Sequence, residues 1–234
     1  MVRLIIAGIA GRMGQRLHAL SLQDPELQVV YGLESPNSTA KVEGVRWGSD
    51  TGELKNTDVV IDFTIAAATI ALLPQVVANK KAIVIGTTGF TPLEEQKIAA
   101  AAKVIPVIKS ANMSLGVNVF FKTAQNMARA LPSYAVHIQE THHIHKKDSP
   151  SGTALQAGRL IEQVSKQKVT YESFREQEIV GDHKIIFTGP ADKIELFHHA
   201  QSRDIFAVGA LQAAKWLAGK KAGLYSMSDV LGIK

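Results

Sequence analysis

The 234-residue sequence predicts an α/β fold: a parallel sheet with helices, followed by a second α+β domain on a mixed, largely antiparallel sheet. Over the first 113 residues, strand-like apolar runs alternate with helical segments, a pattern typical of parallel sheets with right-handed crossovers. A glycine-rich turn follows the first run. After residue 113 the alternation stops, and runs of alternating polar and apolar residues indicate strands with one buried face.

The glycine turn at residues 8–14 lies between an apolar run and a helical segment. Its spacing is G-x-x-G-x-x-G instead of the usual G-x-G-x-x-G, but Ala10 in the middle is small enough for close approach to a pyrophosphate. A second strand is expected at residues 27–33. Glu34 follows it, 20 positions after Gly14, where a carboxylate can accept hydrogen bonds from an adenosine ribose. This domain is therefore predicted to be a Rossmann-like dinucleotide-binding domain.

The other elements of this domain follow from apolar runs and capping signals. Strands are expected at residues 3–7, around 45–47, and at 59–63, 82–86 and 104–108. Pro106 interrupts the last of these, which favours a position near the sheet edge. Helices are expected at residues 15–22, at 66–78 and from Pro92, where Thr91 and Glu94 form a capping box.

In parallel sheets, ligands bind beyond the carboxyl ends of the strands. The residues at those ends, together with the glycine turn, are therefore the candidate cofactor-binding residues: Gly8, Ile9, Ala10, Gly11, Arg12, Met13, Glu34, Phe63, Thr64, Gly86, Thr87, Thr88, Ser110, Ala111, Asn112 and Met113.

The second domain is expected to hold helices at residues 117–131 and 153–166, and strands at 136–140, 176–180, 183–188 and 193–200. An amphipathic helix at residues 205–217 is expected to pack back on the first domain. The predicted division is residues 1–113 plus 204–234 for dinucleotide binding, and residues 114–203 for substrate binding and oligomerisation.

Residues 140–153 combine three histidines, two lysines and a predicted helix N-terminus. Ser151 or Thr153 is the expected N-cap, and the free N–H groups of such a helix end favour an anion. Histidine transfers protons near neutral pH, and lysine supplies a cation or a proton donor. The stretch therefore predicts a site for an anionic small molecule with proton transfer.

Two other interpretations of this stretch are a metal site and a solvated basic loop. His142, His143 and His145 could supply three metal ligands, but the chain has no cysteine and the spacing matches neither H-E-x-x-H nor a finger motif. No metal is therefore expected. The interpretation as a solvated basic loop remains an alternative until the rest of the chain is considered.

The composition, with 46% hydrophobic and 20% charged residues, is ordinary for a globular protein. The absence of cysteine fits a reducing cytosol, and no targeting segment or apolar run long enough for a membrane is present. The net charge of +5 comes from scattered basic residues, which favours an anionic small molecule over nucleic acid. A cytoplasmic protein is expected.

With these motifs in place, the sequence resembles the 4-hydroxy-tetrahydrodipicolinate reductase (dihydrodipicolinate reductase) family of the diaminopimelate route to lysine. The resemblance runs nearly end to end, although the chain is somewhat shorter than typical members. It is carried by Gly8-Ile-Ala-Gly-Arg-Met-Gly14, Asp62-Phe-Thr64, Gly86-Thr-Thr-Gly89, Ser110-Ala-Asn-Met-Ser-Leu-Gly-Val-Asn118, the stretch Glu140 to Ala154, Ser202-Arg203 and the ending Gly223 to Leu231.

The resemblance implies NADH- or NADPH-dependent reduction of 4-hydroxy-2,3,4,5-tetrahydrodipicolinate, or of the dihydrodipicolinate formed by its dehydration, to tetrahydrodipicolinate. It implies His142 as general acid and Lys146 as donor of a proton to the carbanion left by hydride addition; which of them delivers the proton stays open. It also implies that His143, Lys146, Gly152 and Thr153 bind the substrate carboxylates. A homotetramer formed through the second-domain sheet is expected, in a bacterium or a plastid.

One departure from the family concerns the cofactor. Members that use NADPH readily tend to carry Arg directly after the ribose-binding acid, whereas Ser35 follows Glu34 here. A preference for NADH is therefore predicted. Two alternatives are a related NAD-dependent amino-acid dehydrogenase, which would not need the His-His-x-His-Lys stretch, and a non-catalytic NAD-binding redox sensor, which would tolerate loss of His142 and Lys146.

Overall fold

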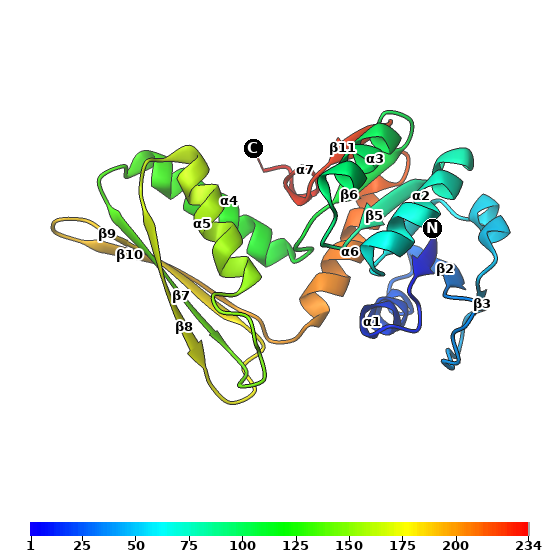
Figure 1. The fold of residues 1–234 in the computed structure, drawn as a ribbon, viewed down its shortest axis with the longest axis horizontal. Helices are drawn as coiled ribbons and strands as arrows, with labels where there is room; N and C mark the ends of the chain where they lie inside the picture. The colour runs from blue at the N-terminus through cyan, green and yellow to red at the C-terminus, as the bar shows by residue number, and fades with distance from the viewer. Residues whose placement is uncertain (234) are drawn as a thin grey trace. The chain divides into compact units, whose positions relative to one another are not determined.

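The computed structural model describes residues 1–233 and has two compact units (Figure 1). One unit comprises Met1–Ser114 and the chain from Phe206 onward, and the other comprises Leu115–Ile205. The predicted fold class is confirmed, because the first unit holds a parallel sheet and the second a mixed one. No helix in the described part of the chain is long and apolar enough to cross a membrane.

The first unit is built on a seven-stranded sheet in the order β11-β6-β5-β4-β1-β2-β3, and its strand pairs are parallel. The strands are β1 (Val2–Ala7), β2 (Leu27–Leu33), β3 (Trp47–Gly48), β4 (Val59–Asp62), β5 (Ala82–Ile85), β6 (Pro106–Lys109) and β11 (Gly223–Tyr225). All four residues of β4 and of β5 are buried, as expected for continuous apolar runs in a parallel sheet. β1 lies between β2 and β4, so the strand order changes direction there; ligands bind at the carboxyl ends of strands at such a point.

The helical segments of this unit are α1 (Arg12–Ser21), η1 (Thr51–Asn56), α2 (Ala66–Ala78), α3 (Pro92–Ala102), most of α6 (Asp204–Leu217) and α7 (Met227–Leu231). The predicted capping box is confirmed: Thr91 accepts a hydrogen bond from the backbone N–H of Glu94, and the Glu94 carboxylate accepts from the backbone N–H of Thr91.

The second unit is a four-stranded sheet in the order β10-β9-β7-β8, with α4 (Leu115–Ala130) and α5 (Gly152–Val164) packed on one face. Its strands are β7 (Ala135–His142), β8 (Val169–Arg175), β9 (Asp182–Thr188) and β10 (Lys193–His199). β7 and β8 are parallel and are joined through α5, whereas the other two pairs are antiparallel. The core beneath the helices includes Val136 and Ile138 of β7, Phe187 of β9 and Phe121 of α4.

One expectation about strands is wrong. Residues 176–180 form a turn and loop instead of a strand, and the strand of this region is β8, which ends at Arg175. The strand with Pro106 lies near the sheet edge, as expected, because only β11 pairs beyond β6 in the described part of the sheet. Proline is tolerated there because it is the first residue of its strand.

Candidate active site

A cavity of about 750 Å³ lies at the carboxyl ends of β1, β2 and β4, which is a common volume for a small-molecule site. Six predicted cofactor-binding residues line it: Gly8, Ala10, Gly11, Glu34, Phe63 and Thr64. Its other lining residues include Ser35, Ser38 and Thr51. Among the lining residues that the structure describes, Glu34 is the only charged one.

The glycine turn has the shape that a pyrophosphate requires. Gly8 adopts a left-handed conformation with φ of +78°, and a Cβ on Gly14 would lie 2.1 Å from the carbonyl oxygen of Gly8. The helix α1 therefore starts directly against the turn. Gly11 caps α1 without a side-chain hydrogen bond, and the first turn carries no acidic residue. The N–H groups at this helix end can hold an anion, so these residues fit a dinucleotide.

Glu34 lies directly beside the glycine turn. Its carboxylate accepts hydrogen bonds from the backbone N–H of Ala10 at 3.1 Å and of Ser35 at 2.9 Å. A carboxylate in this position can accept further hydrogen bonds from ribose hydroxyls, as the sequence spacing suggests.

The remaining predicted cofactor residues do not line this cavity: Ile9, Arg12, Met13, Gly86, Thr87, Thr88, Ser110, Ala111, Asn112 and Met113. Ile9 and Met113 are buried in the apolar core, and Thr87 donates a hydrogen bond to Asp62. Gly86 lies against Phe63, because a Cβ there would be 2.4 Å from the ring. Gly86 thereby leaves space for Phe63 at the cavity wall.

The His-rich stretch belongs entirely to the second unit, where β7 ends at His142 and α5 begins at Gly152. Ser151, one of the two expected N-caps, is the N-cap of α5: its Oγ accepts a hydrogen bond from the backbone N–H of Ala154 at 3.2 Å. Gly152 and Thr153 therefore form the first turn of α5, which begins where the His-rich stretch ends.

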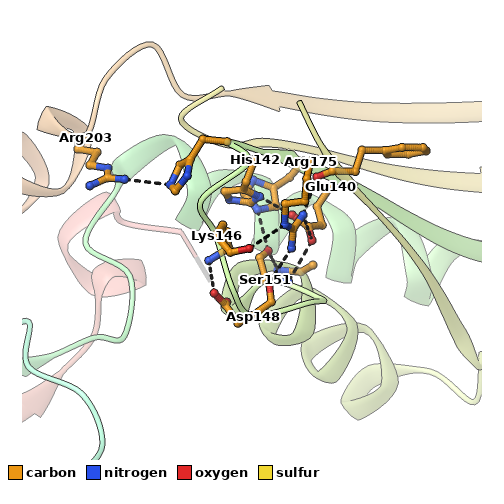
Figure 2. A network of polar contacts seen from close by, with 11 residues as sticks. Glu140, His142, Lys146, Asp148, Ser151, Arg175 and Arg203 are labelled. Atoms are coloured by element: carbon orange, nitrogen blue, oxygen red, sulfur yellow. Dashed lines mark hydrogen bonds and ion pairs between the residues drawn. The ribbon is translucent and has the colours of Figure 1, made fainter. Parts of the chain in front are cut away.

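Glu140 connects His142, Arg175 and Ser151 (Figure 2). His142 Nδ1 is hydrogen-bonded to Glu140 Oε2. Glu140 Oε1 accepts from Arg175 Nη1 at 3.0 Å and from the backbone N–H of Ser151 at 3.3 Å. Arg175 also donates to the backbone oxygen of Asp148 at 2.6 Å. These contacts fix the loop to the end of β8.

Lys146 and Arg203 place positive charge at the loop, and Arg203 donates a hydrogen bond to His143. Lys146 Nζ donates to Asp148 Oδ1 at 2.8 Å, and this hydrogen bond lowers the pKa of Asp148. Arg203 Nη2 lies 3.1 Å from His143 Nε2. His145 is largely exposed and lies 3.9 Å from Glu178. Within residues 1–233, no cluster of three or more potential metal-ligating side chains occurs.

The sequence did not identify Glu140, Arg175, His183 or Arg203 as site residues. Glu140 had a signal, because it continues the inward-facing positions of Val136 and Ile138 and is 1% exposed. A carboxylate at a core position of a strand needs partners nearby. The others come from β8, β9 and the segment before α6, and only the folded arrangement brings them to the loop.

The parallel sheet with its glycine turn and Glu34 fits a dinucleotide, and the comparisons with known proteins define the class as an NAD(P)-dependent oxidoreductase. The family profiles "Dihydrodipicolinate reductase, N-terminus" and "Dihydrodipicolinate reductase, C-terminus" match residues 2–113 and 116–231. The chain belongs to the dihydrodipicolinate reductase family.

Relatives agree with this membership over the full length. The chain is 39% identical to the 4-hydroxy-tetrahydrodipicolinate reductase of Aquifex aeolicus, with 99% of both chains covered. It is also 39% identical to that of Syntrophobacter fumaroxidans, with 100% of both covered. The structure of a dipicolinate-bound dihydrodipicolinate reductase from Paenisporosarcina sp. TG-14 has the same fold, with a TM-score of 0.86, 23% identity and 97% of each chain covered.

These comparisons confirm the predicted family, the NAD(P)H-dependent reductase class and the place in lysine biosynthesis through diaminopimelate. They do not favour the amino-acid dehydrogenase or the redox sensor. A probable dehydrogenase from Thermotoga maritima shares only the fold, with a TM-score of 0.68 and 9% identity.

Proposed function

We propose that the first unit binds the nicotinamide cofactor and that the second binds the substrate and supplies the proton for reduction of 4-hydroxy-2,3,4,5-tetrahydrodipicolinate, or of the dihydrodipicolinate formed by its dehydration, to tetrahydrodipicolinate. The observation that carries this proposal is the placing of Lys146 and His143 in the loop that leads to the capped N-terminus of α5. A cation, further hydrogen-bond donors and a helix N-terminus together suit a dicarboxylate.

His143, Lys146, Gly152 and Thr153 bind the substrate carboxylates in this proposal. Gly152 and Thr153 contribute backbone N–H groups from the first turn of α5, and the side chains of His143 and Lys146 contribute donors. Arg203, which lies against His143, adds a further positive charge at this end of the loop.

Lys146 is proposed as the proton donor. NADH or NADPH, when bound, would supply a hydride to one carbon of a ring double bond, and the electron pair of that double bond would move to the neighbouring ring carbon. Lys146 transfers a proton from Nζ to that carbon, and its charge stabilises the developing negative charge beforehand. His142 is less suited to this step, because burial lowers its pKa and its Nδ1 proton is engaged by Glu140. In this proposal, His142 Nε2 accepts a hydrogen bond from the substrate.

The test is a coupled assay in which the preceding synthase of the route generates the substrate and the absorbance of NADH is followed. Wild-type protein is expected to oxidise NADH only when the synthase is active. Lys146→Ala is expected to lower kcat at least about 100-fold, the usual size of a general-acid contribution. His142→Gln is expected to lower it about 10-fold or more.

Lys147→Ala is the matched control, because it removes the neighbouring lysine, which is exposed. It is expected to keep the wild-type rate. Absence of synthase-dependent NADH oxidation by the wild type would overturn the proposed function. Equal rates for Lys146→Ala and Lys147→Ala would overturn the role of Lys146 alone.

A preference for NADH over NADPH is proposed from the surroundings of Glu34. Ser35 follows it, and Glu34 is the only charged residue among the described lining of the cavity. A 2′-phosphate near this carboxylate is repelled and meets no guanidinium there. We expect kcat/KM to be higher with NADH, and Ser35→Arg to raise kcat/KM with NADPH selectively. A strong preference of the wild type for NADPH would contradict the proposal.

We further propose a homotetramer that assembles through the second-unit sheet and works in the cytoplasm of a bacterium, or in a plastid. The lack of cysteine fits a reducing compartment. The face of the sheet that α4 and α5 leave uncovered carries two exposed phenylalanines, Phe174 and Phe197, which supports assembly through it.

A further inference from the structure

Glu140 is a carboxylate at a position where the strand pattern calls for an apolar side chain. On β7, Val136, Ile138, Glu140 and His142 all point toward the helix-covered side of the sheet. Glu140 is only 1% exposed. A buried ion pair is frequently less stable than well-packed apolar residues of the same volume, so stability alone gives little reason for this acid.

The hydrogen bonds around Glu140 keep it ionised. Burial alone would raise the pKa of Glu140, yet hydrogen bonds from Ser173, Arg175 and His142 outweigh it and hold the pKa below its ordinary value. The Arg175 contact and the Ser151 N–H both reach Oε1. Oε2 is thereby left for His142.

An ionised carboxylate can only accept a hydrogen bond, so the proton of the neutral His142 ring must lie on Nδ1. The ring is held on further sides: His183 meets it edge to face at a centroid distance of 5.1 Å, and a Cβ on Gly181 would lie 2.9 Å from His142 Nε2. With Nδ1 occupied, Nε2 carries the free lone pair.

We infer that Glu140 is a positioning residue of this reductase, whose carboxylate fixes the His142 ring with its proton on Nδ1, so that Nε2 is the nitrogen that His142 presents to the substrate. The inference rests on the proposed role of His142. Glu140 acts through His142, and Arg175 from β8 acts in turn by holding Glu140.

The spectroscopic test uses the full chain labelled with ¹⁵N in its histidines, without cofactor or substrate. The His142 signals are assigned by their loss in His142→Gln. Wild-type protein at neutral pH is expected to show His142 protonated at Nδ1, and Glu140→Gln is expected to shift protonation toward Nε2, because an amide can donate to Nδ1 as well as accept from it. Protonation of wild-type His142 at Nε2 would overturn the inference without any variant.

A titration of the same signals gives a second readout. The carboxylate of Glu140 favours charged His142, whereas Lys146, Arg175 and burial disfavour it, and His183 packs against the ring. Removal of the negative charge in Glu140→Gln is therefore expected to move the titration midpoint of His142 to lower pH. An unchanged midpoint together with an unchanged tautomer would leave Glu140 with a purely structural role and overturn the inference.

The kinetic test separates orientation from binding. Glu140→Gln is expected to lower kcat about 10- to 100-fold, the usual cost of losing a partner that orients a functional histidine, with KM changed less than about twofold. Glu140→Asp keeps the negative charge, but the side chain is one methylene shorter and its carboxylate lies farther from His142. The kcat of this variant is therefore expected to fall as well. An unchanged kcat in both variants would overturn the inference.

Glu172→Gln is the matched control. Glu172 lies on the other face of the same strand pair and is 3.6 Å from another histidine, His137. This control is expected to keep the kcat and the His142 tautomer of the wild type, with light scattering to check that its assembly is unchanged. A wild-type kcat in His142→Gln would show that the proposed role of His142 has failed. A loss in His142→Gln with an unaltered tautomer in Glu140→Gln would overturn only the positioning role.

Discussion

At the scale of single residues, the protonation of His183 makes the stability of the fold depend on pH. It is 5% exposed, and its Nε2 lies 3.2 Å from Ser151 Oγ. Burial lowers the pKa of His183 to about 3. The neighbouring His142 and His198 rings and Lys146 also lower this pKa, whereas Glu140 raises it. Unfolded His183 takes up a proton near its ordinary pKa of about 6.5. The unfolded state therefore binds more protons than the folded state between these values, and stability falls as the pH falls through this window.

His183→Gln is expected to make the free energy of unfolding less dependent on pH. Well below pH 6.5, one such group contributes a slope of about 1.4 kcal/mol per pH unit, and the variant should lose that contribution. Urea unfolding measured between pH 4 and 7 reports the slope directly. The same substitution at the exposed His145 serves as control and should behave as wild type. A slope in His183→Gln as steep as that of the wild type would contradict the prediction.

Local spacing in the sequence could predict some contacts of the candidate site and not others. Ser151 was one of two predicted N-caps, because it directly precedes a helix with apolar periodicity, and in the structure it is the cap of α5. The roles of His142 and Lys146, which lie in the same short stretch, stay predictions. Arg175 reaches Glu140 only through the pairing of β8 with β7, where it stands opposite His142. No pattern along the chain specifies the register between β7 and β8, so the contact of Arg175 with Glu140 could not be predicted from the sequence.

At the scale of an element, the N-terminus of α5 is held by one side chain. Ser151 Oγ accepts from the N–H of Ala154 and contacts His183, while its own N–H donates to Glu140. Ser151→Ala is expected to cost about 1 kcal/mol of stability through loss of the cap. Because Gly152 and Thr153 form the first turn, KM for the dicarboxylate should rise more than kcat falls.

The control for this prediction is Thr91→Ala, which removes the side-chain cap of α3 in the other unit. A comparable loss of stability is expected, with KM for the dicarboxylate unchanged. Chemical denaturation and steady-state kinetics of the two variants give the comparison. If both variants raised KM equally, the effect would be one of general destabilisation and the role of the α5 cap would be wrong.

Two elements were predicted with the bounds that the structure has. The expected strand at residues 27–33 and helix at residues 66–78 coincide with β2 and α2. β8 was missed because its inward positions include the polar Ser173 and its outward positions include the apolar Phe174, so the alternation is weak without its partner β7. β11 and α7 have three and five residues, too few to establish a period.

At the scale of the whole molecule, the proposed tetramer depends on the uncovered face of the second-unit sheet. Phe197 on β10 pairs in register with Lys184 on β9, one position away from the inward-facing Ile185 and Leu196, so it points away from α4 and α5. It is 60% exposed. An aromatic side chain on such a face gains most when a second copy covers it.

Phe197→Glu is therefore expected to shift the proposed tetramer toward smaller species, because a charge in place of this exposed ring must be desolvated on assembly. Sedimentation velocity at micromolar concentration measures the change. Leu22→Glu changes an apolar residue at the end of α1 that is even more exposed than Phe197, and it should keep the wild-type mass. A wild type that sediments as a monomer would contradict the tetramer, and an unchanged tetramer in Phe197→Glu would mean that assembly uses a surface other than this sheet.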